Sequence, residues 1–202
     1  MTAPARVAIV TGAARGIGRA YVRGLAREGY AVVLADIADA SEAAGDVTAL
    51  GGSALEVRVD VSDPASAQRM AAAALERFGR IDALVNNAAY FSQIHKQPFD
   101  EIPVAEWDDV LAVNGSWLCA CAVAPAMKEQ RYGKIVNTSS MTVPSGIPYF
   151  LHYVGSKAAI VGMSRALARE LGEWNIAVNT ISPDYVPHDE DYAGRQPEMA
   201  AH

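Results

Sequence analysis

Tyr153 and Lys157 are two residues whose types and spacing could support acid–base chemistry. On an α-helix, residues four positions apart share one face and lie a single turn apart. The lysine ammonium then favours the ionised form of the tyrosine phenol, which suits that phenol to accept and donate a proton. Tyrosine–lysine pairs at this spacing also occur on ordinary helix surfaces, so the pair points to chemistry only if other residues agree with it.

A glycine-rich turn near the N-terminus could bind an anion. It spans residues 11–18, directly after the β-branched run 7–10 and before a predicted helix over 19–28. Its glycines lack a Cβ, so the first can adopt a conformation closed to other residues, and the others let a ligand and the sheet approach the helix start. The free N–H groups of that helix start favour a pyrophosphate. The three glycines are Gly12, Gly16 and Gly18.

Asp36 closes the short apolar run 30–35, which predicts a second buried strand. A carboxylate at this place, about 20 residues beyond the glycine turn, can accept hydrogen bonds from both hydroxyls of an adenosine ribose and would repel a 2′-phosphate. Asp36 could instead act only as a helix cap or turn residue. Arg15, within the glycine turn, could attract a 2′-phosphate, but we give Asp36 the greater weight. The sequence therefore predicts NAD, with NADP less favoured.

The rest of the chain alternates strand-like and helix-like segments, which predicts a parallel sheet covered on both faces. The expected fold is α/β, a Rossmann-type doubly wound parallel sheet of about six strands, with a ligand crevice outside the carboxyl ends of the strands. The segments 90–103 and 143–148 are expected to be loops, the first with at most a short helix. The expected strands are 7–10, 30–35, 54–59, 81–85, 133–138 and 176–181, and the expected helices are 19–28, 38–50, 64–78, 104–130 and one ending at residue 171.

Length and composition fit one globular domain: the chain has 202 residues, of which 51% are hydrophobic and 20% charged. We expect a single dinucleotide-binding and catalytic domain over 1–187 and a polar tail over 188–202, whose composition is typical of disorder. The net charge is −6, and no run of Lys or Arg could neutralise a phosphate backbone. Nucleic acid is therefore not an expected partner.

Three further features bear on location and on metal or disulfide chemistry. The N-terminal residues lack the apolar core of a signal peptide, so we expect a cytoplasmic protein. The uncharged run 110–127 approaches the length of a membrane span, but polar and helix-breaking residues interrupt it, and we expect a helix buried on two sides and no membrane partner. Cys119 and Cys121 should point to different faces of that helix and stay reduced. The four histidines are scattered, so no metal site is expected.

Taken together, these motifs resemble the short-chain dehydrogenase/reductase family, and the resemblance covers nearly the whole chain. It implies an oxidoreductase that transfers a hydride between NAD(H) and a secondary alcohol or ketone. The hydride transfer itself belongs to the nicotinamide. The matching features, in order, are Thr-Gly-x-x-x-Gly-Ile-Gly at 11–18, Asn-Asn-Ala at 86–88, Asn114, Ser140, Tyr153-x-x-x-Lys157 and a proline turn after the sixth strand.

The resemblance also implies a role for each catalytic residue. Tyr153 would be the general acid/base that exchanges a proton with the substrate oxygen, and Ser140 would hydrogen-bond the same oxygen. Lys157 would favour the phenolate and hold the nicotinamide ribose. Asn114 would position a water that links Lys157 to solvent.

The cofactor contacts that the resemblance implies follow the carboxyl edge of the sheet. The glycine turn would cradle the dinucleotide, Asp60 and Val61 would flank the adenine, and Asn87 with Ala88 would line the middle of the cofactor. The full expected set is Gly12, Arg15, Gly16, Ile17, Gly18, Asp36, Asp60, Val61, Asn87, Ala88, Tyr153, Lys157, Pro183 and Val186.

Three regions depart from the family's pattern. Ala89 stands where the asparagine motif usually ends in glycine, a mild change because only a backbone conformation is at stake. Asp184 replaces the glycine of the usual Pro-Gly turn and would weaken the docking of the nicotinamide amide, and His188 takes the place of a threonine that contacts the cofactor phosphates. The chain also ends at His202, without the family's usual C-terminal helices and seventh strand, so we expect the strand 176–181 to be a bare sheet edge.

Two other functions stay open. A dinucleotide-binding protein with little or no catalysis would follow from the altered cofactor turn and from the missing cover over the substrate. A serine hydrolase that uses Ser140 with His152 is less favoured, because no Gly-x-Ser-x-Gly elbow surrounds the serine and no acidic partner is evident.

The residues expected around the substrate are mostly apolar or aromatic, which favours a small hydrophobic or aromatic alcohol or ketone. Family members form oligomers partly through the helices that here carry Asn114 and Tyr153, so the resemblance implies a homodimer through these helices more readily than a tetramer. The expected substrate-lining residues are Phe91, Thr142, Ile147, Tyr149, Phe150 and Tyr185.

Overall fold

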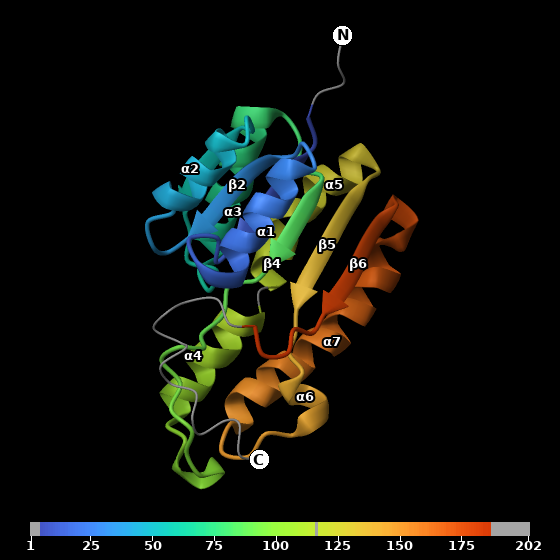
Figure 1. The fold of residues 1–202 in the computed structure, drawn as a ribbon. Coiled ribbons are helices and arrows are strands. Elements are labelled where there is room, and N and C mark those ends of the chain that lie inside the picture. Colours follow the sequence, from blue (N-terminus) through green and yellow to red (C-terminus); the bar gives the residue numbers. More distant parts are fainter. Residues whose placement is uncertain (1–4, 116, 187–202) are drawn as a thin grey trace.

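The computed structural model describes residues 5–115 and 117–186, and a six-stranded parallel sheet lies at its centre (Figure 1). The strands follow the order β3-β2-β1-β4-β5-β6. The order changes direction between β1 and β4, and a ligand crevice forms at such a switch point. The strands are β1 Val7–Thr11, β2 Ala31–Asp36, β3 Ala54–Arg58, β4 Ala83–Asn86, β5 Gly133–Thr138 and β6 Ile176–Ile181.

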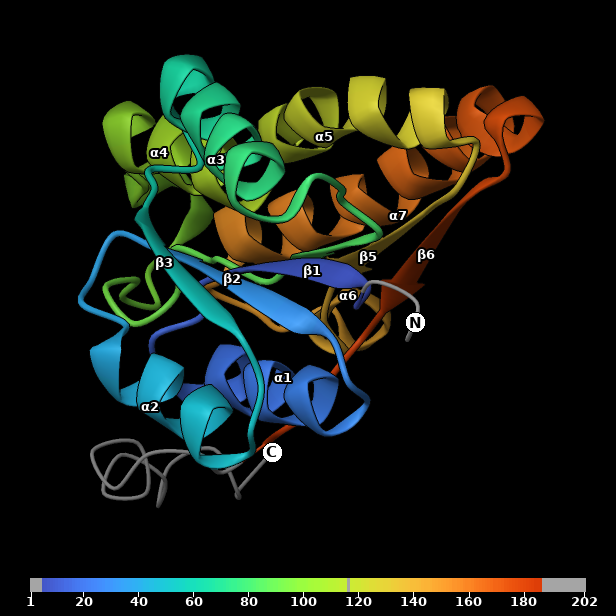
Figure 2. The same ribbon diagram turned by 90° about the horizontal axis from the view of Figure 1, so that it is seen from above.

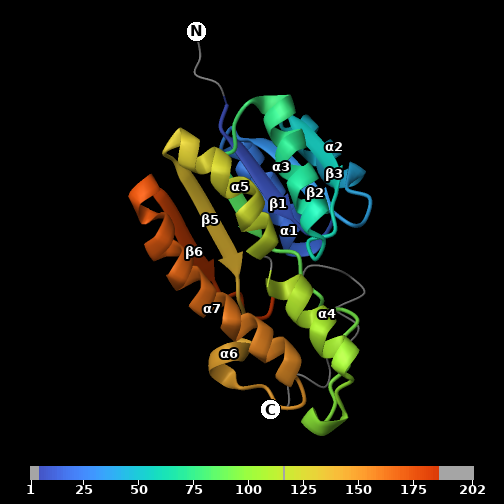
Figure 3. The same cartoon turned by 180° about the vertical axis from the view of Figure 1, so that it is seen from behind.

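Helices cover both faces of the sheet, so the molecule has three layers (Figure 2). Helices α1 and α2 lie on one face, whereas α3, α5 and α7 lie on the other, as Figure 3 shows. Helices α4 and α6 extend past the carboxyl ends of the strands (Figure 1). The helices are α1 Gly16–Arg27, α2 Ser41–Ala49, α3 Pro64–Phe78, α4 Val104–Gly115, α5 Trp117–Gln130, α6 Thr142–Ser145 and α7 Leu151–Leu171, with 3-10 turns η1 Phe99–Glu101 and η2 Gly172–Trp174.

An apolar core lies on each side of the sheet, because successive side chains of a strand point to opposite faces. Val10 and Leu34 pack with Val22 of α1 on one side. Ile9 and Leu84 belong to the core on the other side, under α3 and α5. Burial on both faces explains why these strands are almost continuously apolar.

The expected fold class is confirmed, and several local signals agree with it. Asp63 caps α3 by accepting hydrogen bonds from the N–H groups of Ala65 at 2.9 Å and Ser66 at 3.1 Å, and Pro64 takes the first helical position. Among the described strands β6 pairs with β5 alone, so it lies at the sheet edge as expected.

Several expected boundaries are wrong: α2 begins at Ser41 rather than at residue 38, and β4 begins at Ala83 rather than at residue 81. Helix α1 begins at Gly16 rather than at residue 19, directly after the extended Arg15, so Gly16 and Gly18 lie in its first turn. The expected loop over 143–148 overlaps α6, to which residues 143–145 belong. A proline in the first turn of a helix gives up no needed N–H, and Gly146 then ends this helix in the left-handed conformation with φ of 60°.

The expected helix over 104–130 is described as α4 and α5, on either side of Ser116, which lies outside the described residues. The expectation of a helix buried on two sides is wrong for α4, in which only Val110 and Asn114 are buried. By length and composition the segment Val104–Gln130 could cross a membrane, because an 18-residue window within it has a mean hydropathy of 1.6. Of that window 47% is buried, and core helices of soluble proteins meet the same criterion. In α5, Cys119 is buried and Cys121 exposed, and both are free as predicted.

Candidate active site

Gly12 and Gly18 must be glycines because the backbone approaches itself closely there. A Cβ on Gly18 would lie 1.8 Å from the carbonyl oxygen of Gly12, and a Cβ on Gly12 would lie 2.8 Å from the Cα of Ala88. Gly12 and Gly16 also have positive φ angles of 64° and 56°. No side chain caps the start of α1, and no acidic residue lies in its first turn. The helix therefore presents free N–H groups that favour an anion.

Thr11 and Asn87 fasten the glycine turn to β4. The Thr11 hydroxyl accepts hydrogen bonds from the N–H groups of Asn87 at 3.0 Å and Ala88 at 3.1 Å. The Asn87 side-chain amide donates to the carbonyl oxygens of Thr11 and Gly12, both at 3.1 Å. Asn87 and Ala88, expected beside the cofactor, thus hold the turn in place. Thr11 is a site residue that sequence reasoning named only as part of the motif.

Asp36 ends β2 and reaches across to the glycine turn. One carboxylate oxygen accepts a hydrogen bond from the N–H of Ala14 at 2.9 Å, and the other accepts one from the N–H of Ala38 at 2.9 Å. The turn role left open by the sequence is therefore present. A carboxylate has about four acceptor positions, so Asp36 retains capacity for ribose hydroxyls.

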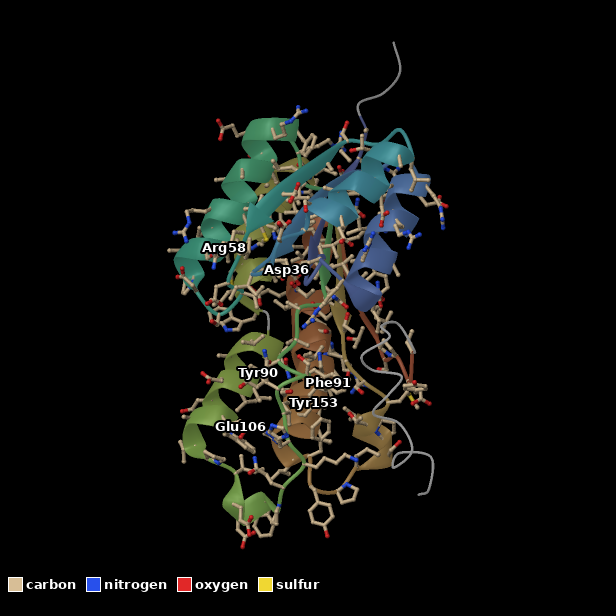
Figure 4. The ribbon with its side chains drawn as sticks, turned by 60° about the vertical axis from the view of Figure 1, so that its left-hand side comes forward. Asp36, Arg58, Tyr90, Phe91, Glu106 and Tyr153 are labelled. Atoms are coloured by element: carbon tan, nitrogen blue, oxygen red, sulfur yellow. The ribbon has the colours of Figure 1, made fainter. Side chains whose placement is uncertain are left out.

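A hollow of about 480 Å³ lies near the end of β2, lined by residues 37–41 and 56–58. Arg58 of β3 is the register partner of Asp36 (Figure 4). Arg15 is exposed at the start of α1. Two cationic side chains therefore come from the elements that surround the Asp36 carboxylate.

The two residues expected to flank an adenine differ in exposure. Asp60 is exposed, and one of its carboxylate oxygens accepts hydrogen bonds from the N–H and the hydroxyl of Ser62, at 2.9 Å and 2.5 Å. Val61 is buried and belongs to the core that also contains α3. Asp60 thus closes a local turn after β3, and the Val61 side chain packs inside the fold.

Lys157 is buried beside Tyr153 on α7. Its side chain is 2% exposed, and its ammonium donates a hydrogen bond to the carbonyl oxygen of Thr138 at 2.8 Å. The ammonium lies 5.7 Å from the centroid of the Tyr153 ring, so the two share a face as predicted. Burial lowers the pKa of Lys157 from 10.5 to about 8, because a low-dielectric environment disfavours the charged form.

The Tyr153 ring is enclosed by aromatic side chains. It is 7% exposed and stacks on Phe150, with ring centroids 4.7 Å apart. Phe91, from the segment between β4 and α4, lies 5.1 Å from the Tyr153 ring, and Figure 4 shows the two labelled side by side. Phe91 and Phe150 also pack edge to face against each other, with centroids 6.1 Å apart, so the three rings form one aromatic cluster.

Ser139 and Ser140 follow β5 and connect it to neighbouring elements. Ser139 donates a hydrogen bond to the carbonyl oxygen of Lys157 at 2.8 Å, which ties β5 to α7. Ser140 is 8% exposed, and its hydroxyl accepts a hydrogen bond from the N–H of Thr142 at 3.2 Å. Ser140 therefore lies at the carboxyl end of β5, near the start of α6.

His152 has an acidic partner that the sequence did not reveal. Its Nε2 lies 3.1 Å from Oε1 of Glu106 in the first turn of α4. Among the described residues, however, no hydrogen bond joins His152 to Ser140. The serine–histidine pair needed for the hydrolase alternative is therefore not assembled.

Asn114 connects α4, the preceding segment and α7. Its side-chain oxygen accepts a hydrogen bond from the N–H of Tyr90 at 2.8 Å, and its amide donates to the hydroxyl of Ser156 at 2.9 Å. Ser156 in turn donates to the carbonyl oxygen of Tyr153 at 2.7 Å. The Asn114 side chain, which the resemblance linked to a water, thus holds protein elements together.

The segment after β6 lies against the segment after β5. The carbonyl oxygen of Pro183 accepts a hydrogen bond from the N–H of Met141 at 3.1 Å. Asp184 is exposed, and Val186 is 42% exposed. Residues 187–202, which include His188 and the expected tail, lie outside the described residues. Within the described part of the chain no group of His, Cys, Asp or Glu could hold a metal ion.

The expected motifs lie close to the carboxyl ends of the strands. Figure 4 shows Asp36 toward one end of this region, and Tyr153 with Phe91 toward the other. The sheet order and the glycine turn after β1 define a Rossmann-type α/β fold, with a carboxylate at the end of β2. Residues 6–194 match the family described as short chain dehydrogenase, and the chain belongs to this oxidoreductase family.

Two proteins that are similar to this chain are a reductase and a dehydrogenase. The 3-oxoacyl-(acyl-carrier-protein) reductase of Synechocystis sp. is 34% identical over 191 residues, which is 92% of this chain and 76% of the relative. The structure of NAD+-bound xylitol dehydrogenase is 36% identical with a TM-score of 0.90, over 97% of this chain and 76% of that one.

The match to this chain can cover only a small part of a much longer relative. The peroxisomal hydratase-dehydrogenase-epimerase of Neurospora crassa is 35% identical over 181 residues, and the match covers 89% of this chain but only 20% of that protein. Similar structures include one solved with NAD+ and another solved with NADP at low occupancy.

Proposed function

We propose that the protein transfers a hydride between NAD(H) and a secondary alcohol or ketone, with Tyr153 as the general acid/base. The observation that carries this proposal is the buried pair on α7. Lys157 is 2% exposed and lies 5.7 Å from the Tyr153 ring, without a salt bridge among the described residues. A buried ammonium without a carboxylate partner is costly, and such groups cluster at functional sites.

The residues at the other end of the site fit a dinucleotide. A side chain at Gly12 or Gly18 would fill the space that the backbone needs, and the free start of α1 suits a pyrophosphate. Asp36 supports NAD over NADP, although Arg58 is its register partner in β3 and Arg15 lies at the start of α1. When bound, the cofactor supplies or accepts the hydride.

In the direction of reduction, Tyr153 donates its phenolic proton to the substrate oxygen. Ser140 donates a hydrogen bond to the same oxygen and stabilises its developing charge. The Lys157 ammonium stabilises the phenolate that Tyr153 leaves behind. In the direction of oxidation, the phenolate takes the proton back from the alcohol.

The aromatic surroundings of Tyr153 support a small hydrophobic or aromatic substrate, because Phe91 and Phe150 pack directly on its ring. We further propose a homodimer through the faces of α4 and α7, where Ala112 and Ala158 are exposed. A cytoplasmic location, a single domain over 1–187 and the lack of nucleic-acid or membrane partners complete this proposal.

The experiment measures NADH binding by fluorescence and turnover by absorbance, on a panel of secondary alcohols and ketones. For Tyr153→Phe we expect kcat to fall by a factor of about 10²–10⁴ while the Kd for NADH stays nearly unchanged, because the proton donor is lost and the ring remains. Tyr132→Phe is the matched control, since Tyr132 lies next to β5 at its other end, and it should keep wild-type activity.

Retained activity in Tyr153→Phe would refute the acid/base role. Tight NADH binding by the wild type without turnover on any substrate would favour the alternative, a dinucleotide-binding protein with little or no catalysis.

A further inference from the structure

Helix α7 carries two pairs of residues at i, i+4 spacing, offset by one position. Tyr153 and Lys157 form the pair already described. His152 and Ser156 form the second pair, and both make hydrogen bonds to α4, through Glu106 and Asn114 respectively. An α-helix has 3.6 residues per turn, so the two pairs lie on adjacent faces of α7. Any rotation of α7 that moves one pair also moves the other.

We propose that His152, through its hydrogen bond to Glu106, is a positioning residue that fixes the rotation of α7 and so the aim of the Tyr153 phenol. This inference rests on the function proposed above for Tyr153. His152 neighbours Tyr153 in the chain but contacts α4, so its effect on the reaction is indirect.

The contact between His152 and Glu106 belongs to a larger tether. The other carboxylate oxygen of Glu106 accepts a hydrogen bond from the side-chain amide of Gln97 at 3.1 Å. The N–H of Gln97 donates to the carbonyl oxygen of Tyr149 at 2.9 Å, just before α7 begins. The first turn of α7 is therefore held both by α4 and by the segment that carries Phe91.

The complete burial of His152 indicates that this side chain does more than stabilise the fold. The His152 side chain is 0% exposed, and its Nδ1 has no hydrogen-bond partner among the described residues. With Glu106 as the acceptor, the ring proton lies on Nε2. An apolar side chain of similar size would fill this place without leaving a buried polar atom unpaired. What the histidine adds is one directed contact to α4.

The imidazole also supports the ring that packs on the phenol. Phe150 lies edge to face against His152, with centroids 6.0 Å apart and planes at 89°. The same Phe150 ring stacks on Tyr153. A displaced His152 would therefore disturb Tyr153 through the backbone and through this shared ring.

The experiment compares His152→Leu, which loses the donor, with His152→Gln, which keeps a side-chain N–H at a similar reach. For His152→Leu we expect kcat to fall by about a hundredfold, since a misplacement near 1 Å has an effect of this order, while the KM and the Kd for NADH stay unchanged. His152→Gln should recover most of the lost kcat. Equal kcat in wild type and His152→Leu, or no recovery in His152→Gln, would overturn the proposal.

Glu106→Gln provides a variant outside α7 in case the leucine variant does not fold. It retains an acceptor oxygen for His152 but removes the charge, so kcat should fall severalfold, which is less than the fall of about a hundredfold expected of a lost contact. A fall of about a hundredfold, or none at all, would contradict a tether that acts through this hydrogen bond.

A second measurement needs no turnover and so separates this inference from the proposed function. The tyrosinate absorbance of each protein is recorded against pH, and the spectrum of the same protein carrying Tyr153→Phe is subtracted. A phenol displaced from the Lys157 ammonium ionises at higher pH, so we expect the transition in His152→Leu to move upward. An unmoved transition would overturn the positioning role. A moved transition in a protein whose wild type lacks turnover would refute only the proposed function.

Discussion

The two ends of the candidate site are built in different ways. At the dinucleotide end, the turn 11–18 is held by close backbone approach and by hydrogen bonds to strands that adjoin β1 in the sheet. At the reactive end, Tyr153 and Lys157 depend on side-chain contacts between α7 and elements distant in the chain, such as Asn114 with Ser156. The first end is encoded by a short motif, and the second by the packing of two helices.

The largest expected effect comes from breaking the dinucleotide end at Gly18. Its alanine variant would place a Cβ 1.8 Å from the carbonyl oxygen of Gly12, so the turn must open. We expect Gly18→Ala to lower the unfolding free energy by about 3 kcal/mol and to abolish NADH binding. Urea denaturation and NADH fluorescence measure both effects.

The matched control lies in the same helix. A Cβ on Gly24 would have no neighbouring atom within 4 Å, so Gly24→Ala should raise stability by up to about 1 kcal/mol and leave NADH binding intact. Equal stability and equal NADH binding in Gly18→Ala and Gly24→Ala would show that the close approach at Gly18 does not determine the shape of the turn.

The reactive end should respond to removal of the buried charge. The folded pKa of Lys157 is about 8, below its ordinary 10.5, so between these values the unfolded chain binds more protons and wild-type stability rises with pH. Lys157→Met should therefore be more stable than wild type at pH 7, by up to about 3 kcal/mol, and this advantage should shrink as the pH rises above 8. Denaturation of both proteins from pH 6 to pH 10 measures the difference. A pH-independent difference would show that burial does not lower the pKa of Lys157 in the folded protein.

A smaller effect is expected on the choice of cofactor at Asp36. Asp36→Ala removes the acceptor that holds the N–H of Ala14 and leaves Arg15 and Arg58 unopposed. NADH should bind about tenfold more weakly and NADPH more tightly, because the repulsion of a 2′-phosphate is lost. Competition titrations with the two cofactors measure the ratio. A wild-type preference for NADPH would show that the arginines outweigh the carboxylate.

The contrast between the dinucleotide end and the reactive end also explains which parts of the structure the sequence predicts. The buried strands, the cap of α3 and the shared face of Tyr153 and Lys157 follow from local patterns, and the structure confirms them. The start of α1 and the presence of α6 depend on backbone conformations at Gly16 and Gly146 that the glycine-rich composition leaves open. A glycine permits a turn, but its presence in the sequence does not determine at which residue the helix begins.

The contacts of the reactive end could not be predicted, because they join residues far apart in the chain. His152 and Glu106 are separated by 46 positions, and Asn114 and Ser156 by 42. No spacing rule connects such pairs, and only the packing of α4 on α7 brings them together. Asp36 was expected to face a ribose, and its hydrogen bond to Ala14 depends likewise on the path of the turn.

Transfer of deuterium from the nicotinamide to a ketone is the most direct test of hydride transfer by this protein. The protein is incubated with NADH deuterated at C4 of the nicotinamide, on either face in separate reactions, together with a panel of hydrophobic and aromatic ketones, and the alcohols are examined by mass spectrometry. We expect deuterium on the carbinol carbon for one of the two labels in the wild type, and a loss of this product in Tyr153→Phe. NADH binding without label in any alcohol, or equal labelling by wild type and Tyr153→Phe, would contradict the proposed function.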